Sequence, residues 1–417
     1  MNGGRMLVIP DEFAGFGDAL LSRPATAVMS YRPLGDDREA TAVGELLSKA
    51  FAFPAAEAVP WLEKSGRHNV RVLREGRRAV ACLLLLPMGQ WFGGRAVPMT
   101  GIAAVGVAPE RRGRGAAAAI MTAMLRELHA QGQPLSALYP ATQVLYRKVG
   151  YEQAGGRWAV EAPVSALVVR GRRAPGQLRT LVDADNAAVN RCYQEVAARG
   201  SGWLDRGEYV WDRVRHPRGE TTFGYGLGGD VIDGYLYFHQ KRATGGRYDL
   251  VLSDFCARTP RAAESLLGFL AAHRSMAESV RLWAASPPPA LIALPEQSYR
   301  VRLDHHWMLR IVDVRKALAL RGYPLGLRAE VHLAIRDEVI RANAGRWVLS
   351  IDDGHARVRR GGRGDLALHI RTLAPLYTGH LAPLELRALG LLQADPTRAA
   401  AASPVFAGPP PGTADMF

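Results

Sequence analysis

The stretch VGVAPERRGRGAAAAIMTAML (residues 105–125) limits the possible folds of this chain more than any other. An apolar strand runs into a proline, then into a loop of arginines and glycines, and then into a helix of small residues. Gly113 and Gly115 carry no Cβ atom, so the loop backbone can approach a ligand closely. The loop opens onto the first turn of a helix, where free N–H groups and the helix dipole attract phosphate. The stretch therefore predicts a phosphate-binding loop.

Two other interpretations compete with phosphate binding by this stretch. The loop could be an ordinary turn before an alanine-rich helix, with its arginines solvated. It could also belong to a dinucleotide-binding βαβ unit, but that unit needs a GxGxxG pattern, and the neighbouring segments are hairpins. The context therefore argues against a dinucleotide site.

A second pattern, YPATQVLYRKVGYEQAG (residues 139–155), follows the loop. The spacing Arg112-x-x-Gly115-x-Ala117, followed by this Tyr-x-x-x-Gly-aromatic pattern, resembles GCN5-related N-acetyltransferases, which bind acetyl-coenzyme A. The resemblance implies that the segment before the second pattern's helix flanks the pantetheine arm, with a threonine hydroxyl as a hydrogen-bond donor. The residues expected to contact the coenzyme are Val105, Gly106, Val107, Arg112, Gly113, Arg114, Gly115, Ala116, Ala117, Ala118, Ala141 and Thr142.

Tyr146 is the candidate general acid by the same resemblance, because the family's tyrosine at this position lies near the thioester sulfur. When an amine attacks the acetyl group, coenzyme A leaves as a thiolate. A phenol with a pKa near 10 is protonated at neutral pH and can give that thiolate a proton. Tyr139 and Tyr151 compete for the role, and Tyr146 could also be an ordinary packed helix residue. The motif favours Tyr146.

The formal net charge of +14 is typical of proteins that bind nucleic acid. The basic residues are nearly all arginine and are spread along the chain, so we expect no nucleic-acid partner. The chain has no apolar run long enough to span a membrane, and acids precede any apolar stretch of signal length. We therefore expect a cytoplasmic protein without a membrane partner.

The three cysteines, Cys82, Cys192 and Cys256, lie far apart in the sequence. They predict neither a disulfide framework nor a cysteine zinc site. His305 and His306 alternate across an expected strand and face opposite sides, which argues against a metal there. We expect no metal cofactor.

The hydrophobic pattern predicts an α+β chain of two or three domains. The first has a mostly antiparallel sheet, the second loosely repeats its order of elements, and the third reads as an antiparallel sheet flanked by helices near 324–417. The main expected strands are 30–34, 68–76, 79–89, 97–108, 135–140, 231–240, 246–255, 281–286 and 305–313. The main expected helices are 37–49, 115–129, 144–150, 183–199 and 261–274.

From about residue 30 to its end, the chain resembles the Eis-type ("enhanced intracellular survival") acetyltransferases. The resemblance implies two GNAT-like domains in tandem, the second degenerate, and a sterol-carrier-protein-like α/β domain. The implied bounds are an extension at 1–29, the catalytic domain at 30–170, the degenerate domain at 171–308 and the last domain with its tail at 309–417. A homo-oligomer, a hexamer, is also implied. The second domain lacks a counterpart of the RGRGA loop, so we expect one coenzyme site per chain.

The chain ends GPPPGTADMF, and such an end would ordinarily fray in solvent. In the family that it resembles, the terminal carboxylate enters the first domain's active site and acts as general base. Phe417 would then supply both that carboxylate and an apolar anchor. The prolines before it would lower the entropy cost of ordering the tail.

The acceptor is expected to be a primary amine of a small molecule, aminoglycoside-like or polyamine-like, or a lysine side chain. Relatives that acetylate aminoglycosides surround them with acids, including a Glu just before the last residue. Here Met416 holds that position, and the segment KAFAFPAAE has no acid until Glu57, which puts aminoglycosides in doubt. The alternative function is lipid or apolar-ligand binding through the sterol-carrier-like domain.

Overall fold

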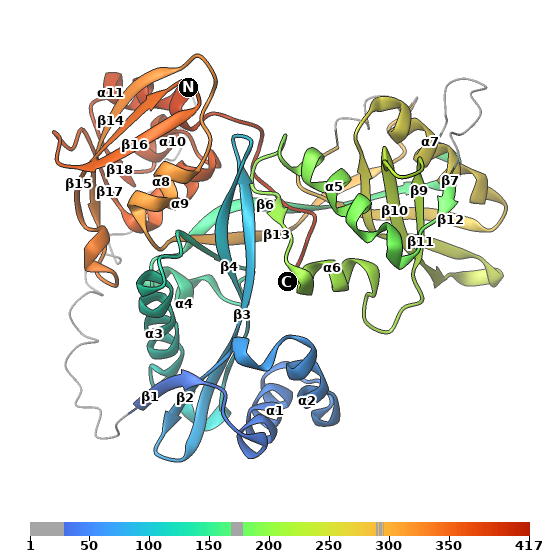
Figure 1. Cartoon of the computed structure of the whole chain (residues 1–417), viewed down its shortest axis with the longest axis horizontal. Helices are drawn as coiled ribbons and strands as arrows, with labels where there is room; N and C mark the ends of the chain where they lie inside the picture. The colour runs from blue at the N-terminus through green and yellow to red at the C-terminus, as the bar shows by residue number, and fades with distance from the viewer. Residues whose placement is uncertain (1–28, 168–177, 289–290, 292–293, 295) are drawn as a thin grey trace, which may run out of the picture.

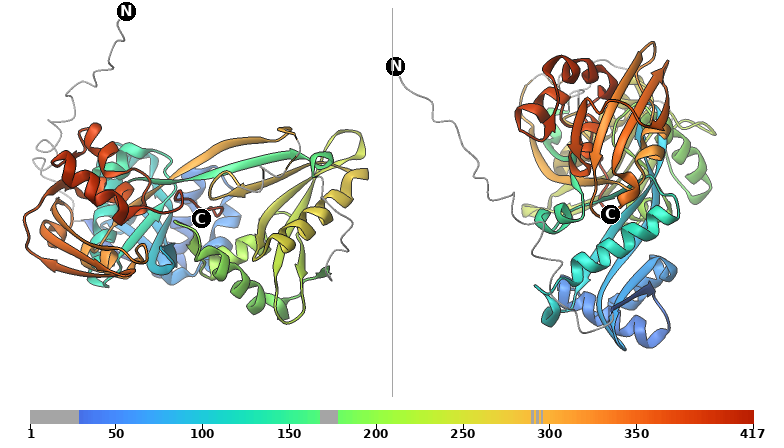
Figure 2. Two further views of the ribbon diagram at one scale, coloured as in Figure 1. Left: turned by 90° about the horizontal axis from the view of Figure 1, so that it is seen from above. Right: turned by 90° about the vertical axis from the view of Figure 1, so that its left-hand side faces the viewer.

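The computed structural model describes residues 29–167, 178–288, 291, 294 and 296–417. The predicted N-terminal extension, residue 29 apart, and the predicted boundary between the first two domains at residues 170 and 171 lie outside these ranges. The described chain forms three parts, and its C-terminus lies where they meet (Figures 1 and 2). No helix in the described ranges combines the length and the hydropathy that a membrane crossing requires.

The first part contains helix α1 where the sequence predicts it. Asp36 caps this helix, because its Oδ1 accepts a hydrogen bond from the Glu39 N–H at 3.0 Å. The buried face of α1 covers one side of the sheet, whereas α3 covers the other side. The elements of this part are β1 (Met29–Pro33), α1 (Asp37–Phe51), α2 (Ala55–Lys64), β2 (Val70–Glu75), β3 (Arg78–Phe92), β4 (Arg95–Val107), α3 (Ala116–Ala130), β5 (Leu135–Leu138), α4 (Gln143–Lys148) and β6 (Glu152–Pro163).

The second part repeats this layered design with its own helices on the sheet. The sequence missed α6, which packs beside β11. The elements of this part are β7 (Leu178–Thr180), α5 (Asn186–Ala197), β8 (Leu204–Asp205), α6 (Glu208–Arg215), β9 (Phe223–Leu227), β10 (Gly234–Arg242), β11 (Tyr248–Ala257), α7 (Pro260–Ala271), β12 (Ala277–Ala284) and β13 (Arg300–Ile311).

One thirteen-stranded sheet runs through both of these parts, in the order β1-β2-β3-β4-β5-β13-β6-β12-β11-β10-β9-β7, with β8 beside β3. Strand β13 lies between β5 and β6, so the last strand of the second part completes the sheet of the first. Sequence patterns could not predict this pairing, because it joins segments that are distant along the chain. The two parts therefore share a continuous hydrogen-bonded framework.

The third part is a five-stranded sheet in the order β16-β15-β14-β17-β18, with helices on it. The prediction of a purely antiparallel sheet is wrong, because β14 and β17 pair in parallel. The elements of this part are α8 (Val314–Leu320), β14 (Arg328–Arg336), β15 (Gly345–Asp352), β16 (His355–Arg360), β17 (Leu366–His369), α9 (Ile370–Thr378), α10 (Pro383–Ala388), β18 (Leu392–Gln393) and α11 (Pro396–Phe406).

A fully buried ion pair joins the third part to the first. Arg310 on β13 donates to both carboxylate oxygens of Asp337, at 2.7 and 2.8 Å, and also to the Val149 carbonyl at 3.0 Å. Helix α9 packs against β6 and β13 beside this pair. Arg310 thus ties the third part to the segment that carries Tyr146.

Candidate active site

The predicted coenzyme loop lies open to solvent between a short 3-10 helix, Pro109–Arg111, and α3. Gly113 and Gly115 have φ angles of +72° and +84°, and nothing lies within 4 Å of a Cβ built on either. No side chain caps the first turn of α3. The loop thus offers exposed amide donors beside two exposed arginines, which is an arrangement that suits a diphosphate.

The described pairing of β4 with β5 covers only three residues and ends at Gly101 opposite Ala137. Strand β4 continues to Val107, so Val105 and its neighbours lie beyond the point where the two strands separate. A bulge lies in this region, because Ala104 has a φ of +50° and the register with β3 shifts. The backbone of β4 is therefore open to an extended ligand on the side of β5.

Of the residues predicted to contact the coenzyme in this region, some are packed in the core and others are partly exposed. Ala116 is buried in the core beneath α3, and a Cβ on Gly106 would lie 2.7 Å from a Leu46 methyl group on α1. These two residues therefore shape the site by packing. Ala117 and Ala118 remain partly exposed on α3.

Thr142 precedes α4 with an extended backbone, and its side chain makes no capping hydrogen bond. Ala141 and Thr142 are both exposed. The hydroxyl of Thr142 is thus placed on the surface beside the start of α4, where the sequence predicts the pantetheine arm.

Tyr146 lies on α4 and is buried in the core between α3 and the sheet. Burial raises the pKa of Tyr146 to about 12. The two competing tyrosines have their hydroxyls engaged: Tyr139 donates to the Asp415 carbonyl at 2.6 Å, and Tyr151 shares a hydrogen bond of 2.7 Å with Ser136. These bonds favour Tyr146 as the phenol available to a ligand.

The C-terminal tail runs between the first two parts of the chain (Figures 1 and 2). Its backbone forms a parallel bridge between Gly412 and Gly156. Arg157 then donates from Nε to the Ala414 carbonyl at 2.8 Å. The tail is therefore bonded to the first part over several residues and does not fray.

The last residue, Phe417, packs at the point where β4 and β5 separate. A Cβ on Gly101 would lie only 2.8 Å from the Phe417 ring, so the ring needs a glycine there. The rings of Phe417 and Tyr139 meet edge to face with centroids 5.6 Å apart. Phe417 contacts the core on the α1–α2 side of the sheet, whereas Tyr146 belongs to the core on the α3–α4 side. The gap between β4 and β5 thus separates the two candidate catalytic groups.

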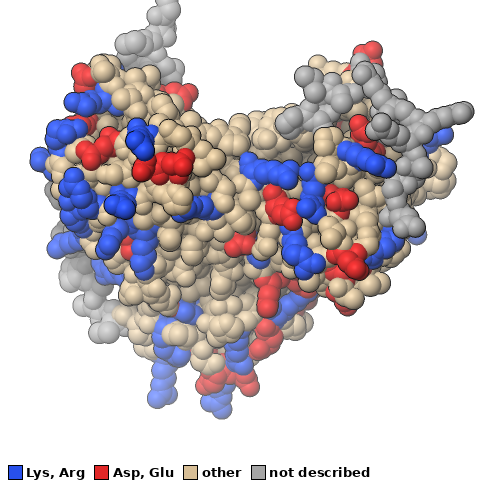
Figure 3. Space-filling model, turned by 45° about the horizontal axis from the view of Figure 1, so that its top comes forward, with Lys and Arg blue, Asp and Glu red and all other residues tan. Residues whose placement is uncertain are grey.

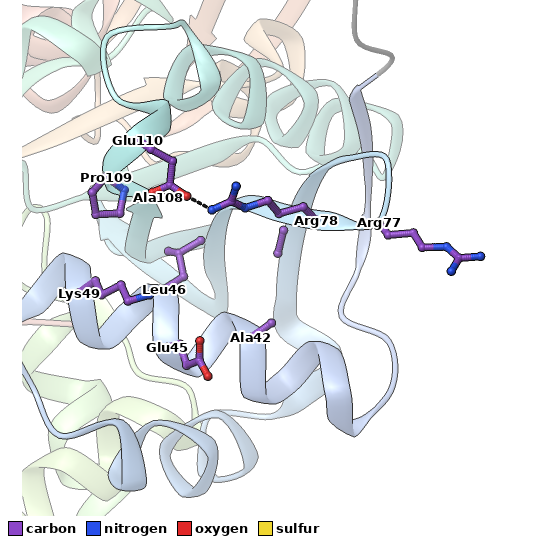
Figure 4. A pocket seen from close by; sticks show the side chains of 10 residues that line it. Ala42, Glu45, Leu46, Lys49, Arg77, Arg78, Ala108, Pro109 and Glu110 are labelled. Carbon is purple, nitrogen blue, oxygen red and sulfur yellow. Dashed lines mark hydrogen bonds and ion pairs between the residues drawn. The ribbon is translucent and has the colours of Figure 1, made fainter.

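A separate cavity of about 430 Å³ lies between α1, the start of β3 and the segment 108–110 (Figure 4). It is bordered by Glu45 and Lys49 on α1 and by Glu110, which pairs with Arg78, while Arg77 points away. None of the predicted site residues lines it. We therefore place the candidate active site at the strand gap and not in this cavity.

The described residues also bear on two other expectations, those for nucleic acid and for a metal ion. On the face shown in Figure 3, acids are interspersed with the basic side chains, so this face carries no continuous basic surface. Across the described ranges, no group of three or more His, Cys, Asp or Glu side chains is arranged to hold a metal ion.

Sequence reasoning missed the residues that receive the tail. Arg157 on β6 and Arg206, between β8 and α6, contact the tail at Ala414 and Asp415. Both arginines look ordinary in an arginine-rich sequence, and only the acid at Asp415 hinted at a partner. The contacts join segments hundreds of residues apart, so no local pattern reports them.

Comparison with known proteins identifies three domain models. "Acetyltransferase (GNAT) domain" models match residues 30–154 and 202–311, and a "Sterol carrier protein domain" model matches 314–413. An uncharacterized N-acetyltransferase of Streptomyces avermitilis is 30% identical over 319 residues, which cover 72% of this chain and 76% of the relative.

Two solved structures share the whole arrangement. A GCN5-related N-acetyltransferase from Anabaena variabilis superposes with a TM-score of 0.89 at 38% identity, over 94% of this chain and 100% of the other. Eis1 from Mycobacterium abscessus gives a TM-score of 0.77 at 21% identity, over 94% and 100%, and so shares the fold. The predicted fold class, with two GNAT domains in tandem and a C-terminal sterol-carrier-like domain, is confirmed.

Proposed function

Because this chain belongs to the GNAT family of N-acetyltransferases, in the Eis-like arrangement of domains, we propose that it transfers an acetyl group from acetyl-coenzyme A to a primary amine. The acceptor is a small aminoglycoside-like or polyamine-like molecule or a lysine side chain. The amine attacks directly while both substrates are bound. The coenzyme supplies an acetyl group activated as a thioester.

The coenzyme-binding proposal rests on the open loop and the open edge of β4. The exposed amides between Arg112 and Ala117 hold the diphosphate, and the backbone near Val105 hydrogen-bonds the extended arm. Gly113 and Gly115 have positive φ angles, which favour glycine, and their lack of a side chain leaves this surface clear. The open loop and the open strand edge support this proposal.

The single observation that carries the catalytic proposal is the position of Phe417, packed on Gly101 where β4 and β5 part. Within the described residues, no basic side chain forms an ion pair with the C-terminal carboxylate. This carboxylate accepts a proton from the acceptor ammonium, directly or through water. The amine then forms the new N–C bond as the C–S bond breaks, and Tyr146 gives a proton to the departing sulfur. The second proton of the nitrogen passes through water to the phenolate of Tyr146, which restores the phenol.

Free-thiol release from acetyl-coenzyme A tests the proposal directly. The panel of acceptors should contain an aminoglycoside, a polyamine and a lysine peptide. A chain with a few residues added after Phe417 should lose turnover while its unfolding temperature stays unchanged. Absence of thiol release with every amine would refute the transferase, and full turnover by the extended chain would remove the terminal carboxylate from the mechanism.

The alternative, a lipid binder acting through the third domain, has less support. Every side chain of α9 except Arg371 is buried, and this helix packs against β6 and β13, so its surface is already covered by protein. We also propose that the enzyme works in the cytoplasm as a homo-oligomer, a hexamer, which light scattering of the purified chain would test.

A further inference from the structure

A buried cluster of charges links the tail to the second domain. Arg206 donates to Asp415 from Nε at 3.0 Å, and its Nη2 lies 2.8 Å from the other carboxylate oxygen. The same guanidinium contacts Asp254 on β11 at 2.5 and 3.1 Å. The exposed fractions of the three side chains are 1% for Arg206, 3% for Asp415 and 5% for Asp254. We call these three residues the tail clamp.

Aromatic residues complete the surroundings of the tail clamp. The guanidinium of Arg206 lies 3.7 Å from the ring centre of Tyr193 and 4.7 Å from that of Trp211. The hydroxyl of Tyr235 donates to Asp254 at 2.7 Å. Arg206 is thus held by residues of the second domain, and it presents a fixed pair of donors to the tail.

Asp415 is bonded to both the first and the second domain. Its side chain binds the second domain through Arg206, and its carbonyl accepts the Tyr139 hydroxyl of the first domain at 2.6 Å. Only two residues separate Asp415 from the end of the chain. Since each residue spans at most about 3.6 Å, the terminal Cα can move no more than roughly 7 Å from this anchor.

We propose that Asp415 and Arg206 are positioning residues that hold the C-terminal carboxylate at the strand gap. This proposal rests on the proposed role of that carboxylate as general base. It also assigns a task to the second domain, which would supply the tail's binding site. The second domain would therefore act in the reaction without binding a coenzyme of its own.

The charge balance of the tail clamp provides a matched pair of variants. One guanidinium contacts two carboxylates, so either Asp415→Asn or Asp254→Asn leaves Arg206 with one buried partner. Only Asp415→Asn loosens the tail, because Asp254→Asn keeps the bond between Arg206 and Asp415. The two variants remove the same charge from the same cluster and differ in which element they release.

Carboxypeptidase A supplies a readout that is independent of catalysis, because it removes an aromatic C-terminal residue only when the tail is accessible. We expect Asp415→Asn to release Phe417 roughly 10- to 100-fold faster than the wild-type chain, since a charged hydrogen bond is lost. Asp254→Asn should stay protected. The kcat of Asp415→Asn should fall while the KM for acetyl-coenzyme A stays unchanged. Thermal unfolding of both variants measures any general loss of stability.

The outcomes separate this inference from the proposed function. Equal protection of Asp415→Asn and the wild-type chain, or equal release from both variants, would overturn the positioning role. The chain extended after Phe417 tests the base itself, because trimming would leave a new terminal carboxylate on Met416. If the extended chain keeps full turnover, the base proposal fails, although faster release of Phe417 from Asp415→Asn would still show that the tail clamp holds the tail.

Discussion

Replacement of Tyr146 by Phe removes one oxygen atom and leaves the packing of α4 in place. The Tyr146 ring lies edge to face with Tyr151, with centroids 6.1 Å apart, and a phenylalanine keeps this contact. Burial raises the pKa of the Tyr146 hydroxyl to about 12, so the phenol stays protonated at every pH at which the enzyme would be assayed. The substitution therefore removes a proton donor and little else.

The raised pKa of Tyr146 sets the size of the expected effect. A thiol has a pKa near 8.5, so complete proton transfer from a phenol of pKa about 12 to the thiolate is uphill by about 5 kcal/mol in the resting site. Proton transfer from Tyr146 should therefore follow the breaking of the C–S bond, so that in the transition state Tyr146 chiefly donates a hydrogen bond to the developing charge. A hydrogen bond to a charged group contributes about 1.5–3 kcal/mol, so kcat should fall roughly 10- to 150-fold. This loss lies mostly below the 10²- to 10⁴-fold range of full acid catalysis.

Steady-state thiol release measures both parameters. We expect Tyr146→Phe to lower kcat with the KM for acetyl-coenzyme A unchanged. The profile of kcat against pH should show no decrease due to Tyr146 between pH 7 and about 10, because the Tyr146 hydroxyl does not lose its proton there. Tyr151→Phe is the control, since its hydroxyl is bonded to Ser136 and should not affect kcat. Unchanged kcat in Tyr146→Phe, or a wild-type basic limb below pH 10 that this variant lacks, would refute the reasoning.

Three further substitutions test the loop, the tail and the domain contact. Gly412→Ala would place a Cβ 1.7 Å from a backbone carbonyl oxygen, so turnover should fall more than about tenfold while the unfolding temperature changes little. Gly115→Ala strains a backbone with φ at +84° by about 1–2 kcal/mol, and calorimetric titration should show coenzyme A affinity weakened roughly 5- to 30-fold. Burial raises the pKa of Glu152, but Arg147 and Arg371 outweigh it and leave the pKa below its ordinary value. Glu152→Gln should therefore cost about 1–3 kcal/mol of unfolding free energy at pH 7, a difference that should disappear in urea titrations as the pH falls from about 4.3 through the lowered pKa. Full turnover of Gly412→Ala would count against the argument on the tail, and unaltered coenzyme A affinity of Gly115→Ala would count against the argument on the loop. A loss of unfolding free energy in Glu152→Gln that persists at low pH would count against the argument on the domain contact.

Local patterns predicted the elements that local forces determine. The aspartate cap fixed the start of α1, and the glycine-rich loop fixed the start of α3 at Ala116, one residue from the expected position. The helix α2 escaped notice because it contains Pro60, which ordinarily ends a helix. Strand β13 was recognised as a strand, but its place between β5 and β6 depends on contacts that span half the chain.

The candidate site divides in the same way. The coenzyme loop and Tyr146 lie on continuous motifs, so the sequence predicts them residue by residue. The tail's destination does not follow from its own composition, because Asp415 needs Arg206 and Phe417 needs the bare backbone of Gly101. Such pairs appear only when the chain is folded.

The glycines of the first two domains show that the tail belongs to the fold of the body. A Cβ on Gly155 would lie 2.6 Å from the Pro411 carbonyl oxygen, and a Cβ on Gly202 would lie 3.0 Å from the Gly412 nitrogen. With Gly101 beneath Phe417, the body leaves space for the tail at three separate places. The same positions also leave room for side chains of the body, because Cβ atoms on Gly155 and Gly202 would lie 2.5 and 3.0 Å from Trp307, and one on Gly101 would lie 2.8 Å from Met88. The tail and the core of the body therefore pack together around these glycines. The proposed active site therefore draws on all three domains. An isolated first domain carries the coenzyme loop and Tyr146, but it would lack the proposed base and the residues of the second domain that hold the tail.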